Sequence, residues 1–207
     1  VSVPCLEENS FVPRAEDIEK AITSRTRAIM LNSPCNPTGA VINREQLEKI
    51  AAVVEKHDLF VVSDEIYESI IFEGEHVPFA TLPGMKDRTM TVGGFSKSHA
   101  MTGWRIGYAI APREILSLMQ VLSIVQSFGV NALAQKAALY ALKTQEEKVR
   151  QRRDIFKERV MYAAERLNAM PGVTCMKPGG SFYLFPNISG TGMNSEEFTF
   201  WLLDKAK

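Results

Sequence analysis

Three short polar motifs hold most of the residues that could do chemistry. They are NSPCNPTG at residues 32–39, DEIY at 64–67 and GGFSKSHAMTGWRIGY at 93–108. Lys97, in the third motif, stands between two serines just after an apolar run, where a solvated lysine gains nothing. A deprotonated amine held at such a place could form a Schiff base with an aldehyde, so the motif raises the question of covalent catalysis.

Each motif follows a short run that we predict to be a β-strand. Residues 27–31, 59–63 and 89–92 are apolar or β-branched, which is typical of strands that a parallel sheet buries on both faces. In open α/β sheets, ligands bind beyond the carboxyl ends of the strands. Strand position alone therefore predicts that four polar side chains converge at one edge of the sheet: Asn36, Asp64, Tyr67 and Lys97.

The connections between these strands predict a mixed, mostly parallel sheet flanked by helices. Residues 43–57 have helical periodicity, with Asn43 and Gln46 placed to cap the helix, so they complete a β-α-β unit. Its apolar positions are Leu47, Ile50, Ala51 and Val54. Residues 95–105 are too few for a parallel return, so the run 106–111 should lie antiparallel. The fold class is α/β.

The rest of the chain predicts helices and then a second domain. Helical patterns continue from Pro112 to about residue 143, and a long one follows at 144–169. The segment 171–190 contains two short strand patterns, which indicate an α+β unit. We therefore expect residues 1–143 to be part of a large domain and 144–207 to begin a small one.

The composition narrows the classes of function. The 207 residues contain 24 Lys and Arg and 24 Asp and Glu, so no net charge attracts nucleic acid or an anionic membrane. No run of 18 apolar residues is present, and the first residues lack a basic stretch followed by an apolar one, so we expect neither a membrane span nor a signal peptide. Three widely spaced cysteines fit a reducing cytoplasm better than a disulfide framework. A small molecule or another protein is the expected partner.

Each candidate residue also has a purely structural interpretation. The Asn36 motif is turn chemistry, Asp64 could cap a helix, and Tyr67 could be a core aromatic. Lys97 could be a solvated charge and Arg105 one member of a surface ion pair.

Taken together, however, these residues match what an aldehyde cofactor with a pyridine ring and a phosphate requires. Lys97 would bind the aldehyde, and the Asp64 carboxylate would keep the ring nitrogen protonated. Amide and phenol groups would contact the ring hydroxyl, and an arginine beside serine hydroxyls and glycine backbone would bind the phosphate. The candidates for these roles are Asn36, Tyr67, Arg105, Ser96 and the Gly93-Gly94 backbone.

The order and spacing of NPTG, DEIY and FSKSHAMTGWRIGY closely resemble the class I/II pyridoxal-phosphate aminotransferases of fold type I. PGGSFYLFPNIS resembles the entry to the small domain of that family. The resemblance implies pyridoxal 5'-phosphate as cofactor, Lys97 as the lysine of its Schiff base and proton shuttle, and Asp64, Asn36, Tyr67 and Arg105 in the roles above. It also implies amino transfer between an L-amino acid and a 2-oxo acid, with a homodimer as the assembly.

The chain departs from the family pattern in three respects. Many relatives carry a hydroxyl residue where Gly94 stands, which leaves Ser96 as the candidate substitute for a phosphate contact. The phosphate loop and ring-stacking aromatic of the family would precede residue 1, and the substrate-carboxylate arginine would follow residue 207. We therefore expect the sequence to be an internal segment of a longer protein.

Other classes of function differ in how well they match. A phosphate-binding NTPase loop needs Gly where Ser96 stands. The nucleophile elbow of a serine hydrolase needs G-x-S-x-G, which residues 94–98 do not match. The chain has three histidines and no HExxH motif, which argues against a metal hydrolase. We interpret His99 as a packing residue. Two alternatives within the fold stay open: a pyridoxal-phosphate-dependent lyase or synthase, and a non-catalytic ligand-sensing domain. Transfer of an amino group to a 2-oxo acid would identify an aminotransferase and distinguish it from both alternatives.

Overall fold

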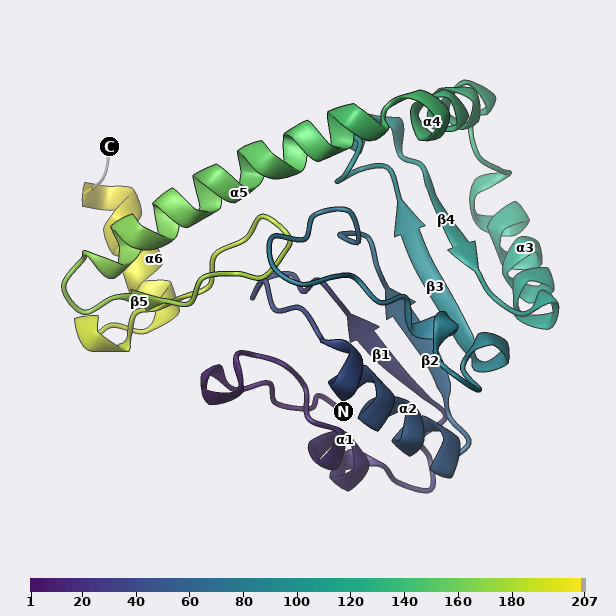
Figure 1. Ribbon diagram of the computed structural model, residues 1–207, viewed down its shortest axis with the longest axis horizontal. Helices are drawn as coiled ribbons and strands as arrows, with labels where there is room; N and C mark the ends of the chain where they lie inside the picture. Colours follow the sequence, from purple (N-terminus) through teal and green to yellow (C-terminus); the bar gives the residue numbers. More distant parts are fainter. Residues whose placement is uncertain (206–207) are drawn as a thin grey trace.

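A four-stranded sheet forms the centre of the computed structural model, which describes residues 1–205. Its strands are β1 (Ala28–Asn32), β2 (Phe60–Asp64), β3 (Thr89–Gly94) and β4 (Gly107–Ile110), in that spatial order (Figure 1). β1, β2 and β3 are parallel, and β4 is antiparallel to β3. The predicted mixed α/β sheet and its antiparallel return are confirmed.

Two helices cover one face of this sheet. α1 (Ala15–Ala21) and α2 (Arg44–Lys56) pack on β1 and β2 through a shared apolar core, and the predicted cap of α2 forms. The Asn43 side-chain oxygen accepts a hydrogen bond from the Gln46 amide at 2.9 Å. The helix buries the predicted positions together with Val53: Leu47, Ile50, Ala51 and Val54.

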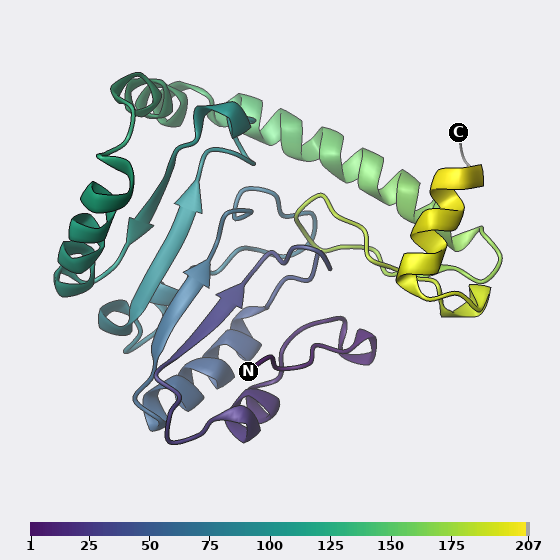
Figure 2. The same cartoon turned by 180° about the vertical axis from the view of Figure 1, so that it is seen from behind.

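The opposite face of the sheet is less well covered (Figure 2). Met30 of β1 is 71% exposed on this face, whereas Leu31 and Val61, which point to the helices, are buried. The prediction that these strands are buried on both faces is therefore wrong for β1. The reason is that α1 and α2 both pack on the same side, so alternate residues of β1 face outwards.

The helical region divides into three helices at two short breaks. α3 (Arg113–Ser127) ends where Phe128 adopts a left-handed φ of 56°. α4 (Ala132–Thr144) is capped by Asn131, which accepts bonds from two amides, and α5 (Glu146–Asn168) follows after Gln145. The domain boundary near 143 falls at this junction but stays a prediction.

The C-terminal segment contains the two predicted short strands. β5 (Thr174–Cys175) and β6 (Pro186–Asn187) pair antiparallel, and α6 (Ser195–Lys205) follows. Single 3-10 turns complete the elements: η1 (Glu7–Asn9), η2 (Phe79–Thr81), η3 (Lys86–Arg88), η4 (Thr102–Trp104) and η5 (Ser189–Thr191).

α5 and the loop between β5 and β6 lie beyond the carboxyl ends of the parallel strands in both ribbon views (Figures 1 and 2). The Gly39 carbonyl accepts bonds from the Gly179 and Gly180 amides at 3.0 and 3.1 Å, and the Phe72 amide donates to Gly179 at 2.8 Å. The C-terminal segment is thereby fastened to the loops that follow β1 and β2. α5 and the loop between β5 and β6 therefore cover the predicted site.

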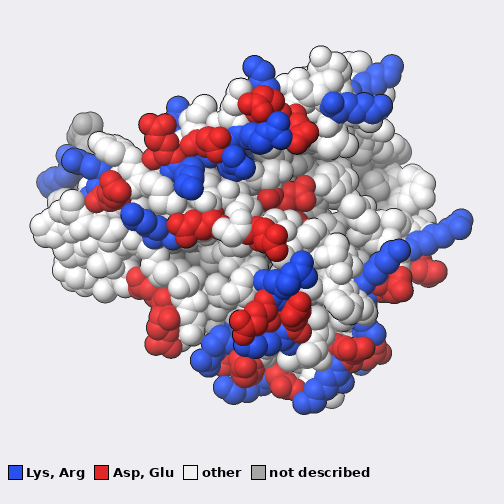
Figure 3. Space-filling model, viewed as in Figure 1, with Lys and Arg blue, Asp and Glu red and all other residues white. Residues whose placement is uncertain are grey.

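The surface has no strong charge of one sign on the face shown in Figure 3. Lys and Arg side chains alternate with Asp and Glu along α5 and over α1 and α2. Within the described part of the chain, every helix is too short or too polar to cross a membrane.

Candidate active site

The carboxyl ends of β1 and β2 are joined by one asparagine that the sequence analysis missed. Asn32 and Asp64 are register partners, and the Asn32 side chain donates to the Asp64 carbonyl at 3.2 Å. The Asn32 side-chain oxygen also accepts a hydrogen bond from the Asn36 amide at 2.8 Å. Asn32 thus fixes the backbone of two predicted site residues. Its position as the last residue of a strand, inside the NSPCNPTG motif, was the available signal.

Asp64 ends β2 at the level of Val92 in β3. One carboxylate oxygen accepts the Ile66 amide at 3.2 Å, which stabilises the turn at residues 66–69. The alternative that Asp64 caps a helix is wrong, because a turn and not a helix follows it. The second oxygen is not engaged by this bond, and the side chain is only partly buried. Asp64 can therefore stabilise the turn and also face a ligand at the edge of the sheet.

Tyr67 is 2% exposed, and its hydroxyl donates to the Tyr183 hydroxyl at 3.1 Å. Burial raises the pKa of Tyr67, and the contact with Tyr183 raises it further, whereas the Asn36 side chain acts in the opposite direction. The nearby Asp64 charge also disfavours the phenolate. The structure therefore brings Asn36, Asp64 and Tyr67 within electrostatic reach of one another and keeps the phenol protonated.

Lys97 lies against the same aromatic group. Its amine is 5.7 Å from the centroid of the Tyr67 ring and 5.9 Å from that of Phe182. Phe182 and Tyr183 come from the loop between β5 and β6, in the motif that the sequence analysis assigned to the small domain. The Lys97 amine thus lies beside two aromatic rings that come from segments distant in the sequence.

The two predicted phosphate contacts are placed differently. Ser96 is half-buried immediately before Lys97. Arg105 is exposed, has a left-handed φ of 49°, and donates to the Thr102 carbonyl at 2.9 Å. Among the described residues, no hydrogen bond or ion pair joins the Arg105 guanidinium to Lys97 or Ser96. Its role toward a phosphate stays a prediction.

The Gly93-Gly94 backbone has a packing role in addition to the predicted one. Both residues lie within β3, opposite Tyr108 and Gly107 of β4. A Cβ atom on Gly93 would lie 2.5 Å from the Tyr108 hydroxyl oxygen. The absence of a side chain therefore lets the Tyr108 ring cross β3.

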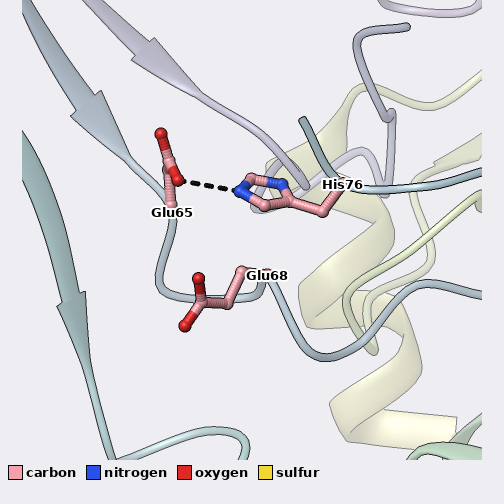
Figure 4. A group of neighbouring side chains, drawn as sticks. All are labelled: Glu65, Glu68 and His76. Carbon is pink, nitrogen blue, oxygen red and sulfur yellow. Dashed lines mark hydrogen bonds and ion pairs between the residues drawn. The ribbon is translucent and has the colours of Figure 1, made fainter. Parts of the chain in front are cut away.

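A buried carboxylate supports the site from the other face of β2. Glu65 is 2% exposed, and its carboxylate meets the Ser63 hydroxyl at 2.8 Å, the Phe79 amide at 3.1 Å and the His76 ring at 2.8 Å (Figure 4). Glu68 completes a group whose polar atoms lie within 4.8 Å of one another. Three hydrogen bonds already engage Glu65, so we assign it to the turn that carries Asp64 and Tyr67.

Comparison with known proteins identifies the family. The model of the family "Aminotransferase class I and II" matches residues 1–207. The chain belongs to this family. It is 41% identical over 210 residues to an aspartate aminotransferase of Pyrococcus abyssi, which covers all of this chain and 54% of that protein. An arginine–pyruvate transaminase of Pseudomonas aeruginosa is 39% identical over 205 residues, 99% of this chain and 52% of that protein.

The structures of relatives agree with this assignment. The aromatic aminotransferase of Pyrococcus horikoshii OT3 superposes with a TM-score of 0.96 at 42% identity, covering all of this chain and 56% of the other. Neighbours of this kind are fold type I aminotransferases. The chain spans about half the length of the curated relatives that it matches.

Class I and II aminotransferases use pyridoxal 5'-phosphate. The side chains at the sheet edge fit that group chemically, because an amine, a carboxylate, an amide and a phenol lie at the ends of neighbouring strands. When bound, the cofactor supplies an aldehyde carbon that accepts an amino group and a ring that draws electrons from the substrate α-carbon. Lys97, Asp64, Asn36 and Tyr67 are the residues of this chain that would hold it.

Proposed function

We propose that the protein is an aminotransferase that moves an amino group between an L-amino acid and a 2-oxo acid. The observation that carries the proposal is the position of the Lys97 amine, 5.7 Å from the centre of the buried Tyr67 ring, at the sheet edge where Asp64 ends its strand. The names of the similar proteins support the same reaction class, since they are aspartate, aromatic and arginine–pyruvate aminotransferases.

Lys97 has two roles in this proposal. Its amine would bind the aldehyde carbon of the cofactor until an amino substrate takes its place. The Lys97 amine, once free, would take the proton from the substrate α-carbon and carry it as the general base and acid of the site. The Tyr67 and Phe182 rings lie beside that amine. Two half-reactions of this kind give ping-pong kinetics.

The remaining site residues orient and charge the cofactor ring. The Asp64 carboxylate would keep a proton on the ring nitrogen, and the Asn36 amide and Tyr67 phenol would contact the ring hydroxyl. Burial and Tyr183 raise the pKa of Tyr67 and keep a proton on its hydroxyl; to donate to the ring hydroxyl, that proton would turn away from Tyr183. Ser96 and Arg105 would contact the phosphate; the Arg105 guanidinium donates from one nitrogen to the Thr102 carbonyl and keeps its other N–H groups for such a contact.

Chemical labelling of the full-length protein tests this function. After loading with pyridoxal phosphate, borohydride reduction fixes any lysine that has condensed with the cofactor, and peptide mass mapping locates it. We expect a label on Lys97, none in Lys97→Ala, and amino transfer from an amino acid to a 2-oxo acid in the parent protein. A label spread over surface lysines, or a label without transfer, would contradict the proposal.

Assembly, location and domain division are further proposals. We propose a homodimer in the cytoplasm, with residues 1–143 in the large domain and 144–207 at the start of the small one. α3 supports a packed partner surface, because it buries none of its residues and exposes an apolar stripe: Leu118, Val121, Leu122 and Val125. Light scattering and cell fractionation test the first two points. Limited proteolysis near Gln145 tests the third.

A further inference from the structure

An arginine on α5 holds the backbone of the turn that carries Lys97. The Arg152 guanidinium donates a hydrogen bond to the carbonyl of Ser98, the residue that directly follows Lys97. Ser98 is 6% exposed, and its hydroxyl bonds the His99 ring nitrogen Nδ1 at 2.8 Å. Arg152 and Ser98 lie 54 positions apart, so only the tertiary structure brings them together.

Among residues 1–205, the backbone hydrogen bonds found within this turn are all short-range. The Phe95 carbonyl accepts the His99 and Met101 amides at 3.2 Å each, and the Lys97 carbonyl accepts the Ala100 amide at 3.3 Å. Ala100 has a left-handed φ of 54°, which is costly for a residue with a side chain. A turn held by long local bonds and a strained residue depends strongly on an anchor from outside.

Arg152 differs from the neighbouring arginines of α5, because its guanidinium contacts the turn and not an acidic side chain. Its neighbours on the helix are paired with acids: Arg150 with Glu146 and Glu147, and Arg153 with Asp154. Within residues 1–205, no carboxylate lies within ion-pair distance of Arg152. Burial lowers the pKa of His99, and the positive charge of Arg152 lowers it further, so the field of this guanidinium reaches the turn.

The same helix contacts the lysine from a second direction. Phe156, one helical turn after Arg152, packs on Phe182 with ring centroids 4.9 Å apart. Phe182 in turn lies 5.9 Å from the Lys97 amine and packs edge-on against Tyr67. Lys157 donates to the Phe72 carbonyl at 3.0 Å, which fixes α5 to the segment after Tyr67.

We propose that Arg152 is a positioning residue for Lys97: its bond to the Ser98 carbonyl holds the lysine turn against α5 and sets where the reactive amine lies. The inference rests on the proposed function. It adds a requirement that none of the three sequence motifs contains, because it makes the lysine depend on the helix that begins the predicted small domain.

The test compares three variants of the full-length protein. Arg152→Met removes the charge and the donors, Arg152→Lys keeps the charge with a single donor group, and Arg153→Met is the control, since its partner is the exposed Asp154. Hydrogen exchange of the cofactor-free protein is measured at the three amides bonded within the turn: His99, Ala100 and Met101.

In Arg152→Met we expect these amides to exchange about tenfold faster or more, since a bond from a charged donor is lost, while the amides of β3 keep their rates. With the cofactor bound, kcat should fall at least about tenfold with KM for the amino donor changed less, because the amine is misplaced rather than the substrate unbound. Arg152→Lys should recover part of both, and Arg153→Met should match the parent.

Outcomes separate this inference from the proposed function. If the parent labels Lys97 and transfers amino groups, but Arg152→Met shows parental exchange and kcat, the positioning role is refuted and the function stands. If the parent does not label Lys97, the function fails, while faster exchange at residues 99–101 would still support the anchor. Should Arg152→Met not fold, Arg152→Lys decides: faster exchange confined to the turn supports the anchor, and parental exchange refutes it.

Discussion

Replacing Glu65 by alanine should destabilise the protein more than any other exchange of a single acidic residue near the site. Glu65 is 2% exposed and accepts from the Ser63 hydroxyl and the Phe79 amide at 2.8 and 3.1 Å, with the His76 ring at 2.8 Å (Figure 4). Alanine removes the carboxylate and leaves all three groups without this partner. The Phe79 amide suffers most, because Phe79 is 1% exposed and water cannot easily replace the carboxylate.

The magnitude follows from the groups left behind. Each buried donor without a partner costs about 1–3 kcal/mol, and removing one member of a buried polar pair costs about 3–5 kcal/mol. We therefore expect a loss of roughly 3–5 kcal/mol in the free energy of unfolding. For a chain of this size, about 2–4 °C is lost per kcal/mol, so the midpoint should fall by at least about 6 °C. Glu65→Gln keeps one oxygen for the Phe79 amide and should lose less.

Glu68→Ala is the matched control for this prediction. Glu68 belongs to the same cluster, but it accepts one hydrogen bond, from the Tyr108 hydroxyl at 3.2 Å, and Tyr108 is 38% exposed. Its loss should cost less than about 1.5 kcal/mol, since water can reach the tyrosine. Thermal unfolding followed by circular dichroism measures both variants. Equal shifts for Glu65→Ala and Glu68→Ala would refute the assignment of Glu65 as the buried anchor of the turn.

Three further predictions concern the site and its frame. Asp64→Ala should weaken cofactor binding roughly tenfold or more and slow removal of the α-proton, measured by equilibrium titration and single-turnover kinetics; near-parental values would overturn the role of Asp64. Burial and Tyr183 raise the pKa of Tyr67 in the folded protein, so as pH rises the unfolded chain loses the phenolic proton before the folded protein does. The contribution of Tyr67 to the free energy of unfolding is therefore complete below about pH 10 and should decline above it. Urea unfolding between pH 8 and about 11 should show that decline, and Tyr67→Phe should flatten it; an unchanged slope would exclude Tyr67 as its source. Gly39→Ala should lower the free energy of unfolding by about 1–3 kcal/mol, because φ is +71° and an added Cβ would lie 2.2 Å from the Pro178 Cβ. An unshifted melting temperature would show that the segment around Pro178 moves aside freely.

Much of the fold was predictable from local pattern. The apolar runs that became β1, β2 and β3, and the helical spacing of α2, reflect burial of one face or stripe, which any fold must respect. The antiparallel β4 followed from the length of its connection. The exposed outer face of β1 was not predictable, because it depends on which side of the sheet the helices occupy.

The sequence by itself determined which chemical groups the site contains, because strand ends and turn motifs place Asn36, Asp64, Tyr67 and Lys97 at one edge of a parallel sheet. Only the tertiary structure decided what surrounds them. Tyr183 lies 116 positions from Tyr67, and Arg152 lies 54 positions from Ser98, yet each makes a hydrogen bond at the site. Such contacts have no local periodicity, since they depend on how α5 and the C-terminal segment pack over the sheet. Local sequence specifies elements and their ends, whereas the partners of a buried polar group are set by packing between elements distant along the chain.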